Sequence, residues 1–264
     1  MDDRRRRRLD EAVAQREGVT RSQARALIME GRVKIGGMPA LKAGANVAPD
    51  AVIEITAPRR FVSRGGEKLE HALQTFAIDV TGKHALDVGA STGGFTDCLL
   101  QRGAAHVVAL DVGYGQLDWR LRNDPRVTVI ERTNFRLLPD DAFDRAFDLI
   151  VIDTSFISLK TIAARAVAYL QSGGDVVALV KPQFEAGRER LGSGGVVRDP
   201  RVHRAILNEV RDAMQQLGLA ATALTASPLL GPAGNREFLL RARREGRVLG
   251  DEVIEAALCE PEST

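Results

Sequence analysis

The sequence predicts an α/β protein in which a doubly wound, mostly parallel seven-stranded sheet follows a small N-terminal α+β domain. From residue 65 onward, short apolar runs typical of buried strands alternate with longer segments typical of helices. This alternation is characteristic of an open parallel sheet with helices on its faces. Before residue 58 the pattern differs, because two helical segments are followed by short alternating strands.

The N-terminal domain, residues 1–58, starts with two predicted helices. The segment LDEAVAQREG has apolar residues at helical spacing and ends at Gly18, and Thr20 is suited to cap a second helix that ends at Gly31. RVKIGG then alternates as a strand into a Gly-Gly turn, and AVIEI at 51–55 alternates again. We place the domain junction in the charged, proline-containing segment APRR that follows.

The second domain is predicted to begin after a linker at 59–64 and to span 65–246, with 247–264 as a C-terminal tail. Its first helix is opened by Gly65 and Gly66. Strands are predicted at 84–89, 106–112, 127–131, 147–153, 175–181, 223–229 and 237–243, and long helices at 158–170 and 199–218. No helical segment separates the last two strands, so we expect an antiparallel hairpin at one edge of the sheet.

The basic charge of the chain is concentrated at its N-terminus. The 264 residues include 37 Lys and Arg against 35 Asp and Glu, whereas the first 60 residues include 13 against 8. A basic segment on a mildly acidic body is typical of a protein that binds a polyanion. A solvated, soluble N-terminus explains the same charge equally well, so this pattern leaves both interpretations open.

The composition argues against several classes of protein. Hydrophobic residues make up 44% of the chain, enough for a sizeable core. Cys98 and Cys259 are too few for a disulfide framework, and without a His/Cys cluster we expect no metal site. The charged start has no apolar segment behind it, and no apolar run approaches the ~18 residues of a membrane span, so we expect a cytoplasmic protein. The sequence carries no signal for the oligomeric state.

The segment LDVGASTGGFTDCLL, residues 86–100, is predicted to be a strand, a glycine-rich turn and the start of a helix. Glycines let a backbone approach a ligand, and a helix N-terminus offers N–H groups. Nicotinamide and flavin enzymes use such turns too, but the Asp87 carboxylate would repel a pyrophosphate. It can instead bind the amino acid part of S-adenosylmethionine, directly or through water, unless it merely caps the turn. Asp111 ends the next strand, where it can accept hydrogen bonds from ribose hydroxyls. The predicted cofactor site comprises Asp87, Gly89, Ala90, Ser91, Thr92, Gly93, Gly94, Asp111 and Asn134.

Four dispersed charged residues form a second candidate constellation. Asp153 and Lys181 each end a predicted strand, at the edge where open α/β sheets bind ligands. Glu237 opens the last strand, and Lys68 lies in the helix that leads into the sheet. A lysine at the end of a hydrophobic strand needs a carboxylate neighbour. Lys181 is therefore expected to be half of a structural ion pair or to help deprotonate a hydroxyl.

These two patterns, together with SRGGEKL, DTSFISL, VKPQFE and GNREFLL, resemble the TlyA/hemolysin A family over residues 4–243. The resemblance implies an S4-like RNA-binding domain followed by an FtsJ-like, Rossmann-like class I methyltransferase domain. It implies 2′-O-methylation of ribose from S-adenosylmethionine, on a cytidine, with ribosomal RNA or ribosomal subunits as partners. It places the catalytic Lys-Asp-Lys-Glu set of such enzymes on Lys68, Asp153, Lys181 and Glu237.

The segment TRSQARALIMEGRVKIGG resembles the S4 pattern, with Gly-Gly where that family usually has an Asn-Gly turn. Arg21 and Arg25 lie one helical turn apart on a face that can meet phosphates, and with Arg4 they are the predicted RNA contacts. The arginine run at 4–8 either adds non-specific attraction or is a frayed tail. The basic, glycine-rich loop at 185–201 is a candidate RNA-contacting lid, although some loop is needed there in any case.

The expected mechanism is a direct displacement, in which positioning of the reactants carries most of the catalysis. Lys181, balanced by Asp153 and Glu237, deprotonates or orients the 2′-hydroxyl, and Lys68 supports the acceptor. No metal is required. The alternatives are a non-catalytic ribosome-assembly RNA-binding protein, a nicotinamide-dependent oxidoreductase and a membrane-lytic hemolysin. The complete set of four charged residues argues against the first and Asp87 against the second. The lack of an apolar or amphipathic membrane segment argues against the third.

Overall fold

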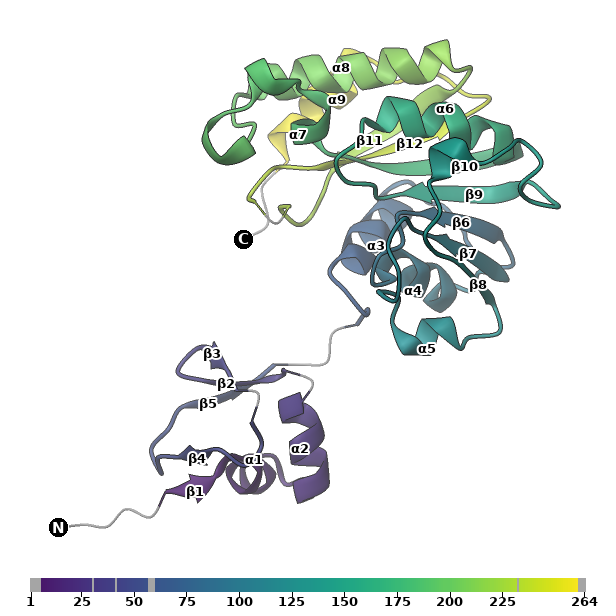
Figure 1. Ribbon diagram of the computed structural model, residues 1–264. Coiled ribbons are helices and arrows are strands. Elements are labelled where there is room, and N and C mark those ends of the chain that lie inside the picture. The colour runs from purple at the N-terminus through teal and green to yellow at the C-terminus, as the bar shows by residue number, and fades with distance from the viewer. Residues whose placement is uncertain (1–5, 30, 41, 57–59, 232, 261–264) are drawn as a thin grey trace. The chain divides into compact units, whose positions relative to one another are not determined.

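The computed structural model describes the chain except for residues 1–5, 30, 41, 57–59, 232 and 261–264 (Figure 1). Arg4, one of the predicted RNA contacts, therefore lies outside the described residues. The chain divides into two compact units, residues 1–60 and 61–264, and each is described by itself.

The first unit combines two helices with two small antiparallel sheets. Its elements are β1 (Arg7–Arg8), α1 (Leu9–Glu17), α2 (Arg21–Met29), β2 (Val33–Ile35), β3 (Met38–Pro39), β4 (Asn46–Val47) and β5 (Ile53–Ile55). β2 pairs with β3 and β5, and β1 pairs with β4. The helices and strands share a core that includes Leu9, Val13 and Ile28, all completely buried.

Capping and turn residues set the ends of these elements as predicted. Gly18 ends α1 in the left-handed conformation, with φ of 65°. At the start of α2, the Gln23 N–H donates to Thr20 Oγ1 at 3.3 Å, and the Thr20 N–H donates to Gln23 Oε1 at 2.9 Å. Gly36 and Gly37 form the turn between β2 and β3 with φ of 56° and 81°. Both helices and the Gly-Gly turn are confirmed.

The second unit is built on one large sheet. Its strands are β6 (His84–Val88), β7 (His106–Leu110), β8 (Val127–Ile130), β9 (Phe147–Ile152), β10 (Leu170–Val180), β11 (Ala220–Ala226) and β12 (Phe238–Arg243). They lie in the order β11-β12-β10-β9-β6-β7-β8. β12 runs antiparallel to β10 and β11, and the other neighbours are parallel. The predicted seven-stranded, mostly parallel sheet with an antiparallel hairpin at one edge is confirmed.

Helices cover both faces of this sheet (Figure 1). They are α3 (Gly65–Thr75), α4 (Gly94–Gln101), α5 (Trp119–Arg122), α6 (Leu159–Tyr169), α7 (Pro182–Glu185), α8 (Pro200–Gln216) and α9 (Asp251–Cys259), with short 3-10 turns η1 (Phe135–Leu137), η2 (Arg188–Arg190) and η3 (Ser193–Gly195). In β6, Leu86 and Val88 belong to the apolar layer that holds α6, α8 and α9, whereas Ala85 belongs to the layer that holds α3 and α4. Successive strand residues face opposite sides, so the sheet is doubly wound.

The start of this unit differs from the sequence prediction. Phe61 is only 3% exposed, and its ring packs so closely on Gly66 that no side chain fits there. The Val62 N–H donates to Asp97 Oδ2 at 2.8 Å. Residues 61–64 therefore belong to the second unit and not to a linker, because an aromatic side chain in this segment completes the core.

The end of the chain also differs from the prediction. Helix α9 lies inside the segment 247–264 that was expected to be a tail, and its Ile254 and Ala257 are buried in the core. Arg236 Nη2 donates to the Glu260 backbone carbonyl at 2.6 Å, which ties the end of this helix to the segment before β12. The burial comes from packing on α8 and β11, which no local sequence signal reveals.

Candidate active site

The carboxyl ends of the parallel strands carry the predicted site. Asp111 follows β7, Asp153 follows β9 and Lys181 follows β10, and parallel neighbours end at the same edge of a sheet. A cavity of about 490 Å³ opens among the loops that follow β6, β7, β8 and β9. This volume suits a small organic ligand.

The cavity is lined by only part of the predicted cofactor site. Gly89, Ser91, Asp111 and Asn134 line it, whereas Asp87, Ala90, Thr92, Gly93 and Gly94 are not among its described lining residues. The sequence analysis missed several lining residues, including Gln116, Thr154, Ser155 and Phe156. The last three follow β9 directly, so the end of that strand in DTSFISL was the signal that could have revealed them.

The glycines of the turn pack the protein against itself. Gly89 has φ of 89°, and a Cβ there would lie 2.5 Å from the Asp153 carbonyl oxygen. A Cβ on Gly94 would lie 2.8 Å from the backbone nitrogen of Gly66, so this glycine lets the starts of α3 and α4 touch. The sequence analysis gave these glycines the role of admitting a ligand. The structure gives each of them a packing role that is sufficient to require glycine.

Asp87 is completely buried at the end of β6. Its Oδ2 accepts a hydrogen bond from Thr96 Oγ1 at 2.7 Å, while Oδ1 has no hydrogen-bond partner among the described residues. The pKa of the Asp87 carboxyl is raised to about 7, mainly by burial and also by the nearby charges of Asp153 and Asp111, against the opposing hydrogen bonds from Thr96. A cationic ligand group would relieve this concentration of acidic side chains.

Asp111 holds the loops around the cavity together. Its Oδ2 accepts from the Ser91 N–H at 2.8 Å, and its Oδ1 accepts from the Gly113 N–H at 2.6 Å. Each oxygen can accept a second hydrogen bond, so ligand hydroxyls can still bind. Asn134 caps η1 through its Oδ1, which accepts from the Arg136 N–H at 3.1 Å.

The four dispersed charged residues form two separate ion pairs. Lys181 Nζ lies 2.7 Å from Asp153 Oδ1 and donates to Ser155 Oγ at 3.0 Å. Lys68 pairs with Glu237, and both of these side chains are buried. The expected balance of Lys181 by both Asp153 and Glu237 is therefore wrong, because the Glu237 carboxylate is engaged by Lys68. Of the two pairs, the one with Lys181 adjoins the cavity, since Asp153 and Ser155 line it.

An exposed aromatic residue stands at the rim of the cavity. Phe156 is 91% exposed and has φ of 64°, a left-handed conformation that costs free energy in a non-glycine residue. Its ring lies 5.2 Å from the ring of Phe184, which follows Lys181 by three residues. The rim thus offers an apolar surface beside the Lys181–Asp153 pair.

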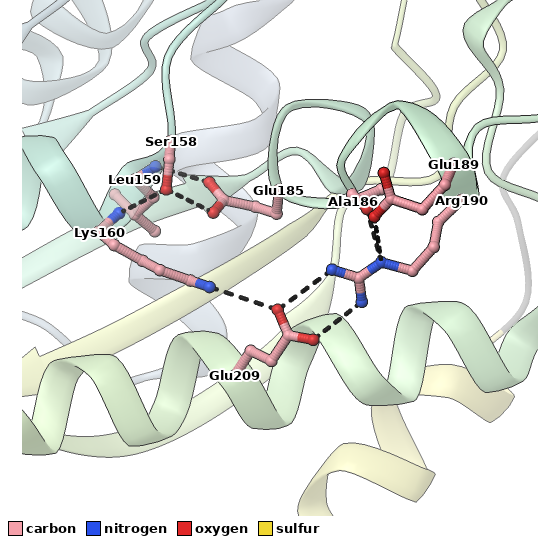
Figure 2. A network of polar contacts seen from close by, with 8 residues as sticks. All are labelled: Ser158, Leu159, Lys160, Glu185, Ala186, Glu189, Arg190 and Glu209. Carbon is pink, nitrogen blue, oxygen red and sulfur yellow. Dashed lines mark hydrogen bonds and ion pairs between the residues drawn. The ribbon is translucent and has the colours of Figure 1, made fainter.

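The segment after Lys181 is anchored to two helices (Figure 2). Glu185 accepts from Ser158 Oγ at 2.7 Å and from the Leu159 N–H at 2.6 Å, at the start of α6. Glu209 of α8 accepts from Arg190 Nη1 at 2.8 Å and from Lys160 Nζ at 3.3 Å. The beginning of the predicted lid is therefore a fixed part of the fold.

The far end of the same segment is held by a buried asparagine. Asn235 is 1% exposed, its Oδ1 accepts from the Val197 N–H at 3.0 Å, and its Nδ2 donates to the Gly195 carbonyl at 3.2 Å. Two residues later comes Glu237, and a Cβ on Gly231 would lie 2.5 Å from its Oε1. Asn235 thus connects the glycine-rich loop to the turn that carries Glu237.

Comparison with known proteins agrees with this arrangement. Residues 61–244 match the family model of FtsJ-like methyltransferases, and residues 7–53 match that of the S4 domain. The chain belongs to the FtsJ-like methyltransferase family. Its relatives include the 16S/23S rRNA (cytidine-2′-O)-methyltransferase TlyA of Mycobacterium tuberculosis, 49% identical over 260 residues that cover 96% of each chain. Hemolysin A of Brachyspira hyodysenteriae is 43% identical and covers 88% of this chain and 98% of its own. The resemblance to the TlyA/hemolysin A family is confirmed.

Solved structures support the same assignment of fold. A candidate hemolysin from Streptococcus thermophilus superposes with a TM-score of 0.73 at 39% identity, over 96% of each chain. A candidate S-adenosylmethionine-dependent methyltransferase from Listeria monocytogenes has a TM-score of 0.52 at 16% identity, over 69% of this chain and 99% of that one, and shows the shared fold alone. The Rossmann-like methyltransferase fold with an N-terminal S4 domain is confirmed.

The S4 domain of this FtsJ-like methyltransferase carries a cluster of three arginines. Arg8, Arg21 and Arg25 all contact the buried carboxylate of Asp10. Two of them are the predicted RNA contacts, but the sequence analysis missed Asp10 and placed Arg8 in a basic or frayed run. The structure pairs Arg8 with Asn46 in a strand, so at this residue the run is ordered.

The described residues of this FtsJ-like methyltransferase contain neither a membrane-spanning helix nor a cluster of metal ligands. Within the described part of the chain, no helix is long and apolar enough to cross a membrane. The same residues contain no group of three or more His, Cys, Asp or Glu side chains placed to hold a metal ion.

Proposed function

We propose that this chain transfers the methyl group of S-adenosylmethionine to a ribose 2′-hydroxyl of ribosomal RNA, on a cytidine. The observation that carries the proposal is the Lys181–Asp153 pair at the ends of two adjacent parallel strands, beside a cavity of ligand size. The relative TlyA, nearly half identical over almost the whole chain, is named for this reaction. Acting on ribosomal RNA implies a cytoplasmic protein.

The residues around the cavity fit this methyl donor. When bound, the donor would supply a methyl group attached to a positively charged sulfonium sulfur. Loss of the methyl group turns that sulfonium into a neutral thioether. Asp87 has an unpartnered, buried Oδ1 that suits the donor's ammonium group, directly or through water. Asp111 keeps acceptor capacity for ribose hydroxyls, and Asn134 contributes to the same wall. Three carboxylates near one cavity favour a cation over a pyrophosphate.

Lys181 is the residue that we assign to the acceptor. Its ammonium is held at a fixed position by Asp153 and Ser155. From there it would orient the 2′-hydroxyl toward the bound donor, and the Asp153 carboxylate of the pair would accept the hydroxyl proton, since the ammonium cannot. The chain contributes positioning and charge, which is sufficient for a direct displacement.

The second ion pair supports the site from outside the cavity lining. Lys68 of α3 and Glu237 before β12 are buried together, so each neutralises a charge that would otherwise be costly. We assign them to positioning of the turn that carries Glu237 and of the acceptor. Phe156 offers an exposed ring on which an RNA base can stack.

The S4 domain and the basic loop are assigned to RNA. Arg21 and Arg25, with Arg4 at the N-terminus, bind phosphates and add affinity without taking part in chemistry. The loop at 185–201, which follows Lys181, contacts RNA next to the acceptor. In this proposal the S4 domain binds RNA and the domain that follows it transfers the methyl group.

Methylation of purified ribosomal subunits with labelled donor tests this proposal. Label is expected on a cytidine ribose of ribosomal RNA, and mapping the modified nucleotide identifies the site. Subunit binding without labelled product would favour a non-catalytic assembly factor. Binding of NADH without donor binding would favour an oxidoreductase, and leakage of liposomes would favour a lytic protein.

A further inference from the structure

We propose that Asp10 is a positioning residue that assembles Arg8, Arg21 and Arg25 into one binding site for RNA phosphates. The inference deepens the proposed function and rests on its assignment of RNA binding to the S4 domain. It adds an acidic residue to a site whose ligand is an anion, which is the reverse of what charge alone suggests.

The contacts converge on a single carboxylate. Arg8 binds Asp10 in the bidentate manner, with Nε to Oδ1 and Nη2 to Oδ2 both at 3.0 Å. Nε of Arg21 and Nε of Arg25 lie 3.1 Å and 3.0 Å from the same Oδ2. Three guanidinium groups from β1 and α2 are thus fixed around one group of α1. Bidentate and charge-assisted contacts of this kind define geometry as well as energy.

The burial of these groups is unequal in a way that suits a ligand site. The Asp10 side chain is 0% exposed, while the side chains of Arg8, Arg21 and Arg25 are 40%, 44% and 52% exposed. A carboxylate can balance only one of three cations, so the cluster stays positive where it meets solvent. Glu11 also contacts Arg21, at 3.0 Å, but it is 47% exposed and therefore screened by water.

The arginines retain donors for a phosphate. Arg25 contacts Asp10 through Nε, so its two terminal amino groups can serve phosphate oxygens. Gly44 lies against the Arg8 guanidinium, where a Cβ would come within 3.1 Å of Nη2. The backbone there leaves room for the planar group, and the Asp10 N–H donates to the neighbouring Ala43 carbonyl at 3.0 Å. The whole cluster is tied to the backbone of the domain.

A fixed cluster binds anions better than three mobile side chains do. Arginine side chains lose considerable conformational entropy when they are immobilised, and preorganisation removes that cost from the binding step. The three arginines also hold the pKa of the Asp10 carboxyl well below its usual range, with Arg8 the largest cause. Asp10 is therefore ionised at every pH at which RNA binding would be measured.

Asp10→Asn separates this inference from simple electrostatics. The substitution removes a negative charge from a basic domain, so charge alone predicts tighter RNA binding. Loss of the organising carboxylate predicts weaker binding. With the full chain and purified ribosomal subunits, we expect the Kd to rise about tenfold or more and the salt dependence of binding to decrease. Asp50→Asn is the matched control, because it removes one exposed negative charge from the same domain and should bind as tightly as wild type or more tightly.

Arg25→Lys gives a second measurement that does not depend on a buried substitution. It keeps the charge at a half-exposed position but loses the planar fork that reaches both Asp10 and a phosphate. Weaker binding by Arg25→Lys, with donor binding unchanged, supports the inference even if Asp10→Asn fails to fold. Wild-type affinity in Arg25→Lys, or in a folded Asp10→Asn protein, overturns it.

A separate variant tests the assumption on which the inference rests. Reversing both charges, Arg21→Glu with Arg25→Glu, should strongly weaken binding to the subunits. If this double variant binds like wild type, the S4 domain does not bind RNA through these residues, and the proposed function fails at that point. If the double variant is weak while folded Asp10→Asn binds normally, only the role of Asp10 is wrong.

Discussion

At the scale of single residues, the proposed role of Lys181 in methyl transfer can be tested by substitution. Lys181→Ala removes the ammonium that we propose orients the acceptor, while Asp153 is 24% exposed and can be solvated in its absence. We expect methyl transfer to fall by roughly 10²–10⁴-fold, the usual contribution of a general acid or base, with donor binding largely retained. Methyl transfer and melting temperature should be measured on the same preparation.

Lys83→Ala is the matched control for that experiment. Lys83 also forms an ion pair, at 3.7 Å with Asp175, but it precedes β6 and is not among the residues that line the cavity. Its removal should leave the methylation rate close to that of wild type. A folded Lys181→Ala protein that methylates RNA as fast as the Lys83 control would refute the assignment of Lys181.

Asp87 should make the stability of the protein depend on pH in an unusual direction. Its pKa is raised to about 7 in the folded protein, against about 3.9 in an unfolded chain. Below both values the group is protonated in both states and costs nothing. Between about pH 4 and pH 7 only the unfolded chain is ionised, so this contribution to stability is lost as pH rises through that window. Melting curves of wild type and Asp87→Asn should therefore diverge progressively from pH 4 to pH 7, and a constant difference would contradict the prediction.

The same group should couple donor binding to protons. If the ionised carboxylate binds the donor's ammonium, binding must remove the proton that Asp87 carries below about pH 7. We expect donor affinity to increase from pH 5.5 toward pH 7, with proton release on the acidic side. Calorimetry in buffers of different ionisation enthalpy measures that release directly. A pH-independent wild-type affinity equal to that of Asp87→Asn would rule the coupling out.

At the scale of elements, the loop after β10 is a bridge between the two ion pairs and not a free flap. It starts at Lys181, is pinned through Glu185 and Arg190, and ends on Asn235, two residues before Glu237. A shift of the loop would therefore be felt at both lysines. Close approach of elements also explains the need for glycine where α3 meets α4 and where the ends of β6 and β9 touch, because a side chain would not fit there.

Asn235→Ala tests this bridge. The substitution leaves the Val197 N–H and the Gly195 carbonyl without their partner, and each lost bond at a buried group costs about 1–3 kcal/mol. We expect faster cleavage by trypsin within residues 187–198 and slower methyl transfer, with donor affinity unchanged. Asn208→Ala is the control, because the half-buried Asn208 side chain donates to the Arg204 carbonyl of its own helix, α8. Unchanged proteolysis and unchanged turnover in the Asn235 variant would show that the loop is held by other contacts.

The type and order of the elements were the part of the fold that the sequence predicted best, whereas bounds differed by several residues, as at β10, which starts at Leu170 and not at 175. Apolar runs marked all seven strands, since a strand in a sheet covered on both faces by helices needs such a run. Packing contacts between elements that are distant in the sequence could not be predicted from it. Helix α9 becomes part of the core only through α8 and β11, and Phe61 through Gly66.

The candidate site, like the fold, was predictable where it depends on strand ends and not where it depends on distant contacts. Strand ends located Asp111, Asp153 and Lys181, and the sequence analysis expected Asp153 beside Lys181, but the pairing of Lys68 with Glu237 did not follow from the sequence. Lys68 and Glu237 are 169 residues apart, and their pairing depends on where β12 enters the sheet. The contacts of Asp10 could not be predicted either, because its three arginine partners come from two different elements.

At the scale of the whole molecule, the two units should be separable in function. A truncated chain that begins at Phe61 keeps both apolar layers of the second unit, so it should fold and bind the donor as the full chain does. It lacks the arginine cluster and should bind ribosomal subunits more weakly, with a smaller dependence on salt. Calorimetry and subunit binding over a salt series check both statements. Equal methylation of subunits by the truncated and full chains at limiting subunit concentration would show that the S4 domain is dispensable.

The position of β12 sets an order in time. This strand is the last of the sheet to be synthesised, yet it lies between β10 and β11, and β11 has no other neighbour in the described sheet. Strand β11 can join the sheet only after β12 has been synthesised. Lys68 can form its ion pair only after Glu237, the residue before β12, has been synthesised. The N-terminal unit, by contrast, is complete after the first 60 residues and can fold while the rest emerges. We therefore expect the N-terminal unit to bind RNA during synthesis well before the second unit can methylate RNA.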